Sequence, residues 1–167
     1  MSPQFLDTEA AFALRAKQLV DCLYDQMADA LVEKGVTIIS KTMGIVQLLY
    51  SEGAKSQADI AERLKYSHQL TAQRLAWLYK HDFAVSEPDP EDARRRLVRL
   101  TAAGMAEGEK LQAFLPLLIE AYDNLFEEIH MDLDAAIQKA HRALEDTPLK
   151  IRMPQAQTTR RQAGGAI

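Results

Sequence analysis

The segment that decides the fold is DPEDARRRLVRLTAAG, residues 89–104. Its first four residues cannot lie inside a helix or a central strand, because proline lacks a backbone N–H and fixes its own φ angle. Further on, Val98 and Leu100 alternate with other residue types in the period of a strand. Residues 95–101 are therefore predicted to pair with residues 83–87 in a β-hairpin with a long, charged tip.

Two capped helices precede this hairpin. The segment SQADIAERL, residues 56–64, begins with Ser56, and Asp59 follows three positions later, which is typical of a capping box. A second serine, Ser67, opens another helix, predicted to end near residue 81. Two short helices joined by a tight turn indicate a helix-turn-helix. With the hairpin directly after it, the whole region is predicted to be a winged helix.

Long helices are predicted on both sides of the winged helix-turn-helix, which spans residues 37–101. Residues 8–34 and 103–146 carry apolar residues every three or four positions, the spacing of one helical stripe. Each stripe would leave a large apolar face exposed on a monomer, so we expect both to join two chains as a homodimer. The predicted fold class is mainly α with a small β-hairpin, in one domain over residues 8–146. A flexible basic tail is expected at residues 147–167.

Composition and charge limit the location and the partners. The 167 residues include one cysteine, too few for an internal disulfide, and no apolar run approaches the roughly 20 residues of a membrane span. The first seven residues lack the cationic and then apolar order of a signal peptide, so we expect a cytoplasmic protein with no membrane partner. The net charge of −4 argues against nucleic acid as a partner. Residues 55–101, however, hold 9 basic against 7 acidic groups, a local charge of +2.

The quoted segments resemble the wing and the helix-turn-helix of the MarR family of bacterial transcriptional regulators. The run Asp-x-x-Asp-x-Arg followed by a strand ending Leu-Thr-x-x-Gly carries the resemblance, which extends more loosely over residues 8–146. It implies a homodimer that binds a near-palindromic operator in double-stranded DNA and is released by a small, often aromatic, ligand. It also implies that Asp92 is the wing aspartate and that Arg94 approaches the minor groove. The chain departs from the pattern at Asp82, where glycine is usual, and at Ser86 and Glu87, where arginines are frequent.

The candidate DNA-binding residues lie on the second helix of the helix-turn-helix and on the wing. At about 100° per residue, Thr71, Leu75 and Leu78 share one arc and must face the core, which places Gln69 and Gln73 on the opposite face. A glutamine can make a bidentate contact with adenine N6 and N7, and a helix N-terminus suits a phosphate. The candidate set is Ser67, His68, Gln69, Gln73, Arg74, Lys80, Arg94, Arg95 and Arg96, with Asp92 as a structural residue of the wing.

A ligand pocket between the dimerisation and DNA-binding parts is predicted from Tyr24, Met27, Met43 and Met105. Aromatic and thioether residues at helical spacing are also typical of an ordinary core, so this second interpretation stays open. The sequence shows no glycine-rich phosphate loop, nucleophile elbow or paired metal-ligand spacing. We therefore expect no catalysis, no cofactor and no metal.

Two other functions remain open. The acidic surface and the reduced charge of the wing fit a winged-helix protein-interaction module with weak or no DNA binding. Cys22 also allows a thiol redox sensor. A reactive thiol needs nearby cations, whereas Cys22 is flanked by Asp21 and Asp25, so we expect a passive, buried cysteine.

Overall fold

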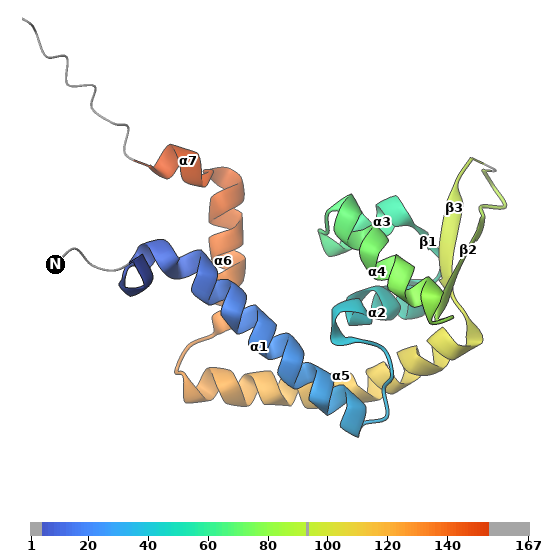
Figure 1. Cartoon of the computed structure of the whole chain (residues 1–167), viewed down its shortest axis with the longest axis horizontal. Helices are drawn as coiled ribbons and strands as arrows, with labels where there is room; N and C mark the ends of the chain where they lie inside the picture. Colours follow the sequence, from blue (N-terminus) through green and yellow to red (C-terminus); the bar gives the residue numbers. More distant parts are fainter. Residues whose placement is uncertain (1–4, 93, 154–167) are drawn as a thin grey trace, which may run out of the picture. The chain divides into compact units, whose positions relative to one another are not determined.

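The computed structural model describes residues 5–92 and 94–153. The chain divides into two compact units, Met1–Ile119 and Glu120–Ile167. Figure 1 labels the elements that these units contain. The helices and strands are α1 (Phe12–Glu33), α2 (Met43–Glu52), β1 (Lys55–Ser56), α3 (Gln57–Leu64), α4 (His68–Lys80), β2 (Ala84–Pro88), β3 (Arg96–Leu100), α5 (Ala102–Glu128), α6 (Leu133–Asp146) and α7 (Leu149–Arg152).

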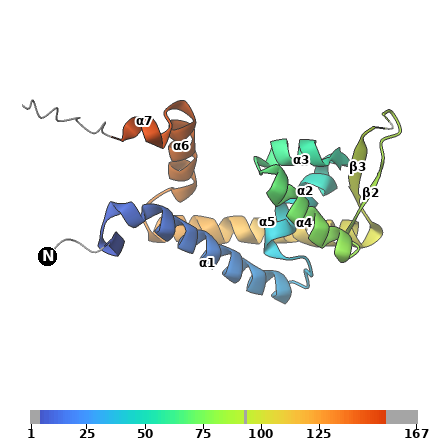
Figure 2. The same cartoon turned by 45° about the horizontal axis from the view of Figure 1, so that its top comes forward.

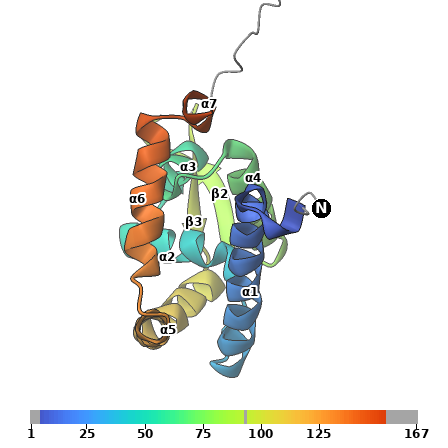
Figure 3. The same ribbon diagram turned by 90° about the vertical axis from the view of Figure 1, so that its left-hand side faces the viewer.

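The predicted β-hairpin forms and gains a third strand. Strands β2 and β3 pair antiparallel, with Ala84 opposite Leu100 and Pro88 opposite Arg96. The two-residue strand β1 pairs with the other edge of β3, so the sheet order is β1-β3-β2. The strand pair lies beside α3 and α4 and extends past them as a wing (Figure 2 and Figure 3). The fold class predicted from the sequence, a mainly helical winged helix-turn-helix, is confirmed.

The core of the first unit lies where the helix-turn-helix meets the wing. As predicted, Thr71, Leu75 and Leu78 of α4 are fully buried. Two residues of the wing strand, Val98 and Leu100, close the core from the sheet side. Other large buried side chains come from α1, α2, α3 and α5, and include Leu31, Ile45, Val46, Ile60, Leu111 and Phe114.

Both predicted caps of the helix-turn-helix are present. The backbone N–H of Asp59 donates to Ser56 Oγ at 3.2 Å, and the N–H of Ser56 donates to Asp59 Oδ2 at 3.1 Å, which completes a capping box. At the start of α4, the N–H of Leu70 donates to Ser67 Oγ at 3.1 Å. After α4 the chain turns at Asp82 with a φ of 59°, a left-handed conformation that explains why glycine is favoured there. The caps and the left-handed turn at Asp82 fix where α4 begins and where it ends.

The Leu-Thr-x-x-Gly motif fastens α5 to the turn after α4. The Thr101 hydroxyl donates to the Asp82 carbonyl at 2.6 Å and accepts from the Gly104 N–H at 3.1 Å. The Thr101 N–H donates to the Phe83 carbonyl at 3.1 Å. A Cβ on Gly104 would lie 1.9 Å from the Phe83 carbonyl oxygen, so only glycine permits this approach. The motif therefore ties the wing, the end of α4 and the start of α5 together.

The first helix differs from the prediction at its N-terminal half. Its α-helical part begins at Phe12, after two 3₁₀ turns at Phe5–Asp7 and Glu9–Ala11, rather than at residue 8. Leu31, near its end, is the residue of α1 that is buried. The first half of the helix contributes nothing to the core, and Cys22 is exposed there. The prediction that Cys22 is buried is therefore wrong.

The second unit contains α6 and α7. Asp132 caps α6, with the Ala135 N–H donating to its carboxylate at 2.8 Å. The apolar positions Ile137 and Leu144 are exposed. A flexible tail was expected from residue 147 on, whereas α7 forms at Leu149–Arg152, and Arg152 Nε donates back to the Thr147 carbonyl at 2.9 Å. The tail prediction for residues 154–167 lies outside the described residues. None of the helices in the described ranges is both long and apolar enough to cross a bilayer.

Candidate nucleic-acid interface

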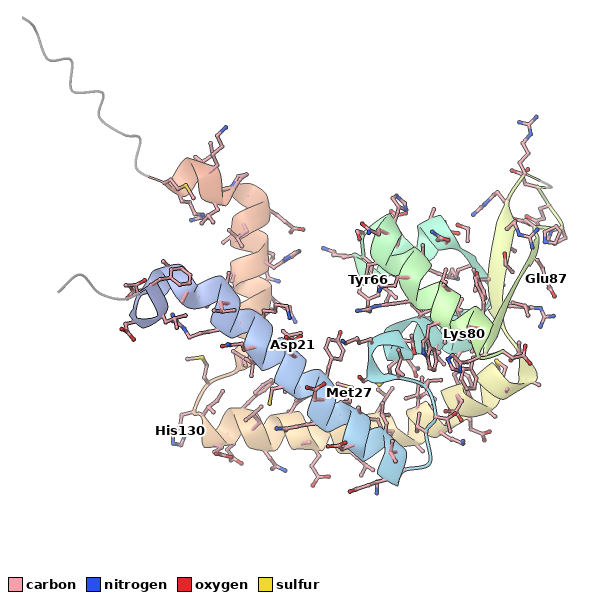
Figure 4. All side chains as sticks on the ribbon, in the orientation of Figure 1. Asp21, Met27, Tyr66, Lys80, Glu87 and His130 are labelled. Atoms are coloured by element: carbon pink, nitrogen blue, oxygen red, sulfur yellow. The ribbon has the colours of Figure 1, made fainter. Side chains whose placement is uncertain are left out.

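The exposed face of α4 carries the polar residues that the helix periodicity predicts. Because one face of α4 is held in the core, the opposite face is open to solvent. Figure 4 labels Lys80 at the C-terminal end of this helix. The exposed predicted residues are Ser67, His68, Gln69, Gln73 and Lys80. These side chains form a row of hydrogen-bonding groups beginning at a helix N-terminus, where phosphate is favoured.

Arg74 does not join this row. Its guanidinium carbon lies 4.2 Å from the centre of the Tyr66 ring, a cation–π contact. Its Nη1 atom is buried and has no hydrogen-bond partner among the described residues. One step of about 100° beyond Gln73 brings Arg74 to the edge of the core, where the aromatic ring covers it. The structure therefore separates Arg74 from the other predicted residues of α4.

Two aspartates shape the tip of the wing. The carboxylate of Asp92 accepts from the Arg94 N–H at 2.9 Å, and the carboxylate of Asp89 accepts from the Glu91 N–H at 2.9 Å. Such contacts between an aspartate and the N–H two residues on stabilise tight turns. The Asp89 N–H also donates to the Arg95 carbonyl at 3.0 Å, which closes the tip.

Most arginines of the wing are engaged within the chain. Arg95 Nη2 lies 2.9 Å from Asp59 Oδ2, so the wing is joined to α3. Arg96 Nε donates to Ser86 Oγ at 3.0 Å, across the hairpin. Arg94 is exposed and makes no side-chain hydrogen bond or ion pair within residues 5–92 and 94–153. Of the three predicted wing arginines, Arg94 is therefore the one most available to a duplex.

A fourth wing arginine, Arg99, is paired with Glu87. Glu87 is one of the positions at which the sequence departs from the MarR pattern. Arg99 Nε and Nη2 lie 2.7 and 2.6 Å from the two carboxylate oxygens of Glu87, a bidentate pair. Hydrogen bonding to Arg99 holds the pKa of Glu87 below its ordinary value. Figure 4 shows Glu87 on the wing. The Glu87 carboxylate would thus compete with any bound phosphate for this guanidinium.

Replacing this acid is expected to strengthen DNA binding. Both partners are about half exposed, so the pair contributes little to the stability of the fold. In Glu87→Gln, Arg99 becomes free to contact phosphate, and the plot of log affinity against log salt steepens by about 0.9 for each such contact. A fluorescence-anisotropy titration at several salt concentrations measures this change. Glu62→Gln, with the same change in net charge on α3, serves as the control. Equal slopes for the two variants would contradict a specific role of the Glu87–Arg99 pair.

A cavity of about 480 Å³ lies between α1 and the segment that joins α1 to α2, within the first unit. Of the predicted ligand residues, Tyr24 lines it, whereas Met27 and Met43 pack against the core and Met105 is exposed. The predicted set is therefore not brought together. The other lining residues come from α1 and from the segment between α1 and α2: Asp25, Ala28, Val32, Gly35, Val36, Thr37, Ile38, Ile39, Ser40 and Lys41. The apolar run VTII at residues 36–39, after the helix-ending Gly35, is the sequence signal for this wall.

Cys22 and the acidic residues form no metal site in the part of the chain that the structure describes. No cluster of three or more His, Cys, Asp or Glu side chains there is placed to hold an ion. The Cys22 sulfur accepts from Gln26 Nε2 at 3.3 Å, a contact within one turn of α1.

Comparisons by sequence and by structure give different results. No protein-family model matches the chain, and no curated protein matches its sequence. The structure is similar to that of the PcaV transcriptional regulator from Streptomyces coelicolor in complex with its natural ligand. There the TM-score is 0.63 at 20% identity, and the match covers 88% of this chain and 98% of that one.

Two further solved structures are similar. The S. aureus MepR–DNA complex matches with a TM-score of 0.65 at 18% identity, over 81% of this chain and 97% of that one. The heme sensor protein PefR from Streptococcus agalactiae, in complex with heme, matches with a TM-score of 0.52 at 18% identity, over 83% and 95%. At these identities the likeness concerns the fold.

Proposed function

Because the chain has the MarR-type winged-helix fold, we propose that it is a DNA-binding transcriptional regulator that acts as a homodimer on a near-palindromic operator. One observation carries the proposal. The α4 helix buries Thr71, Leu75 and Leu78, and this leaves Gln69 and Gln73 exposed on its opposite face. A helix with such a face, followed by a wing, suits entry into a major groove.

The similar structures support this function. MepR was solved as a DNA complex, and PcaV is described as a transcriptional regulator bound to its natural ligand. The same fold in this chain places its polar α4 face and its wing on one winged helix. The regulator role therefore agrees with both the residues and the fold.

The homodimer is proposed from burial. Apolar side chains of α1 such as Leu14, Leu19 and Val20 are 40–45% exposed, and Ile137 of α6 is 55% exposed. Pairing two chains through such faces would remove apolar surface from water. A two-fold dimer would present one α4 to each half-site, about one DNA turn apart.

The cavity is the proposed site for a small, aromatic ligand that releases the DNA. Its volume of about 480 Å³ lies within the usual range of small-molecule sites, roughly 300–1,000 Å³. Val32, Val36 and Ile38 supply an apolar lining, and Tyr24 and Lys41 add polar groups.

A salt titration with double-stranded DNA tests the proposed function. Binding that neutralises even two phosphates weakens about tenfold between roughly 50 and 200 mM salt. We expect at least this dependence, with a clear preference for some duplex sequences over others. A flat response, or no binding to any duplex selected from a random pool, would instead favour the protein-interaction module.

Two substitutions separate the roles of the wing and of α4. Arg94→Ala removes a phosphate or minor-groove contact and is expected to weaken binding to all duplexes alike. Gln73→Ala is expected to relax the preference at one base position, by about 1–3 kcal/mol of discrimination. Affinities for a set of single-base operator variants measure both effects. Uniform losses for Gln73→Ala would contradict base reading by Gln73.

A further inference from the structure

A buried carboxylate of α5 holds the segment between α1 and α2. The side chain of Glu107 is 5% exposed. Its Oε2 accepts from the Thr37 N–H at 2.6 Å and from the Ile38 N–H at 3.3 Å. Its Oε1 lies 2.6 Å from Lys110 Nζ, which also donates to the Gly35 carbonyl at 2.8 Å. Residues 35–38 are thus fastened to α5 by side chains about one helical turn apart.

The same segment forms a wall of the cavity. Gly35, Val36, Thr37 and Ile38 all line it. Buried N–H groups must keep acceptors, so a ligand that displaces this wall must either carry Glu107 along or break its hydrogen bonds. The position of the wall and the position of α5 are therefore linked.

One turn before Glu107, α5 contacts the turn that follows α4. Gly104 lies directly against the Phe83 carbonyl, because a Cβ on Gly104 would be 1.9 Å from the carbonyl oxygen. The Phe83 ring stacks on Trp77 of α4, with ring centres 5.9 Å apart. Trp77 also stacks on His81, at 4.2 Å. Packed and hydrogen-bonded contacts therefore run without a gap from the cavity wall to α4.

We propose that Glu107 is a positioning residue through which a small, largely apolar ligand in this cavity changes the placement of α4. The inference rests on the proposed function, because it assigns the regulation of that DNA-binding surface. Lys110 supports Glu107 by holding the Gly35 carbonyl at the same wall. A double-mutant cycle measures this coupling.

The experiment fills the cavity without a ligand. Ala28 lines the cavity, and a phenyl ring has room in about 480 Å³, so Ala28→Phe imitates an occupant. The substitution is made in three full-length backgrounds: the unmodified chain, Glu107→Met and Glu109→Met. Glu109 is exposed on the same helix and provides the matched control. Circular dichroism checks folding, and Lys110→Met replaces Glu107→Met if the latter does not fold, because Lys110 is about half exposed.

Two measurements report on α4, which lies at the other end of these contacts from the cavity. One is the affinity for a duplex selected from a random pool by the unmodified protein. The other is the emission of Trp77, the single tryptophan of the chain. In the unmodified and Glu109→Met backgrounds, Ala28→Phe is expected to weaken binding about tenfold and to shift the emission. In the Glu107→Met background, both effects are expected to fall to about twofold or less.

Each outcome either supports or overturns the role of Glu107. Equal effects of Ala28→Phe in all three backgrounds, or no effect in any, would overturn the role of Glu107 while leaving DNA binding intact. If the unmodified chain binds no duplex, the proposed function fails. The emission of Trp77 then still decides whether Glu107 links the cavity to α4: a shift that depends on Glu107 supports the link, and any other result overturns it.

Discussion

Gly104→Ala is expected to destabilise the fold by about 3 kcal/mol or more, a loss typical of overpacking that the backbone must absorb. The added Cβ would lie 1.9 Å from the Phe83 carbonyl oxygen and 3.0 Å from its carbon. Both are backbone atoms, so no side-chain rotation relieves the clash. Helix α5 would have to move away from the turn after α4, which breaks the contacts of Thr101 with Asp82 and Phe83.

Gly44→Ala provides the matched control for this substitution. Gly44 lies in α2, where the new Cβ would meet the Tyr66 hydroxyl at 3.2 Å, the far end of a side chain. Alanine favours helix over glycine by about 1 kcal/mol, so we expect little loss or a small gain. Urea unfolding followed by circular dichroism measures both variants. Similar midpoints for Gly104→Ala and the unmodified protein would contradict the close approach of α5 to Phe83.

Glu107→Ala is expected to cost about 3 kcal/mol in stability, because two backbone N–H groups and one ammonium lose their acceptor. The N–H groups belong to Thr37 and Ile38, and the ammonium to Lys110. Glu109→Ala removes an exposed carboxylate from the same helix and should change stability by no more than about 0.5 kcal/mol. Equal losses for both variants would show that helix charge, and not the wall contacts, is responsible.

The loss in Glu107→Ala is also expected to depend on pH. Burial alone would raise the pKa of Glu107, but the hydrogen bonds from Lys110, Thr37 and Ile38 outweigh it and hold this pKa below the ordinary value of 4.5. A carboxylate with a lowered pKa stabilises the fold fully above its unfolded pKa, and the gain is lost as the pH falls through the folded pKa. The stability difference between the two proteins should therefore be constant near pH 7 and shrink below about pH 4.5. Urea titrations over this range check it, and a difference that grows on acidification would reverse the assigned sign.

The winged helix could be predicted because its signals are local. The Ser56–Asp59 capping box and the Ser67 cap join residues three positions apart, and the helix period alone placed Leu75 and Leu78 in the core. Such contacts depend on sequence spacing and not on how distant segments pack. The same reasoning placed the hairpin, since Val98 and Leu100 alternate along one strand.

Contacts between distant segments could not be predicted in this way. Glu107 meets Thr37 across 70 positions, and Arg95 meets Asp59 across 36. No periodicity relates these residues, so neither the cavity wall nor the pairing of the wing arginines appears in the sequence. The exposure of Cys22 was missed for a related reason: the apolar stripe of α1 predicts burial, but Leu31, near the end of the helix, is the residue of α1 that is buried.

Carbethoxylation of histidines by diethylpyrocarbonate, read by mass spectrometry, tests most directly whether α4 and the wing bind DNA. His68 is exposed at the first position of α4, and His141, exposed on α6, is the internal control. When the full chain is saturated with a selected duplex, we expect labelling of His68 to fall several-fold while labelling of His141 stays unchanged. Unchanged labelling of His68 in a chain that binds the duplex would place the DNA elsewhere and contradict the assignment of α4 as the reading helix.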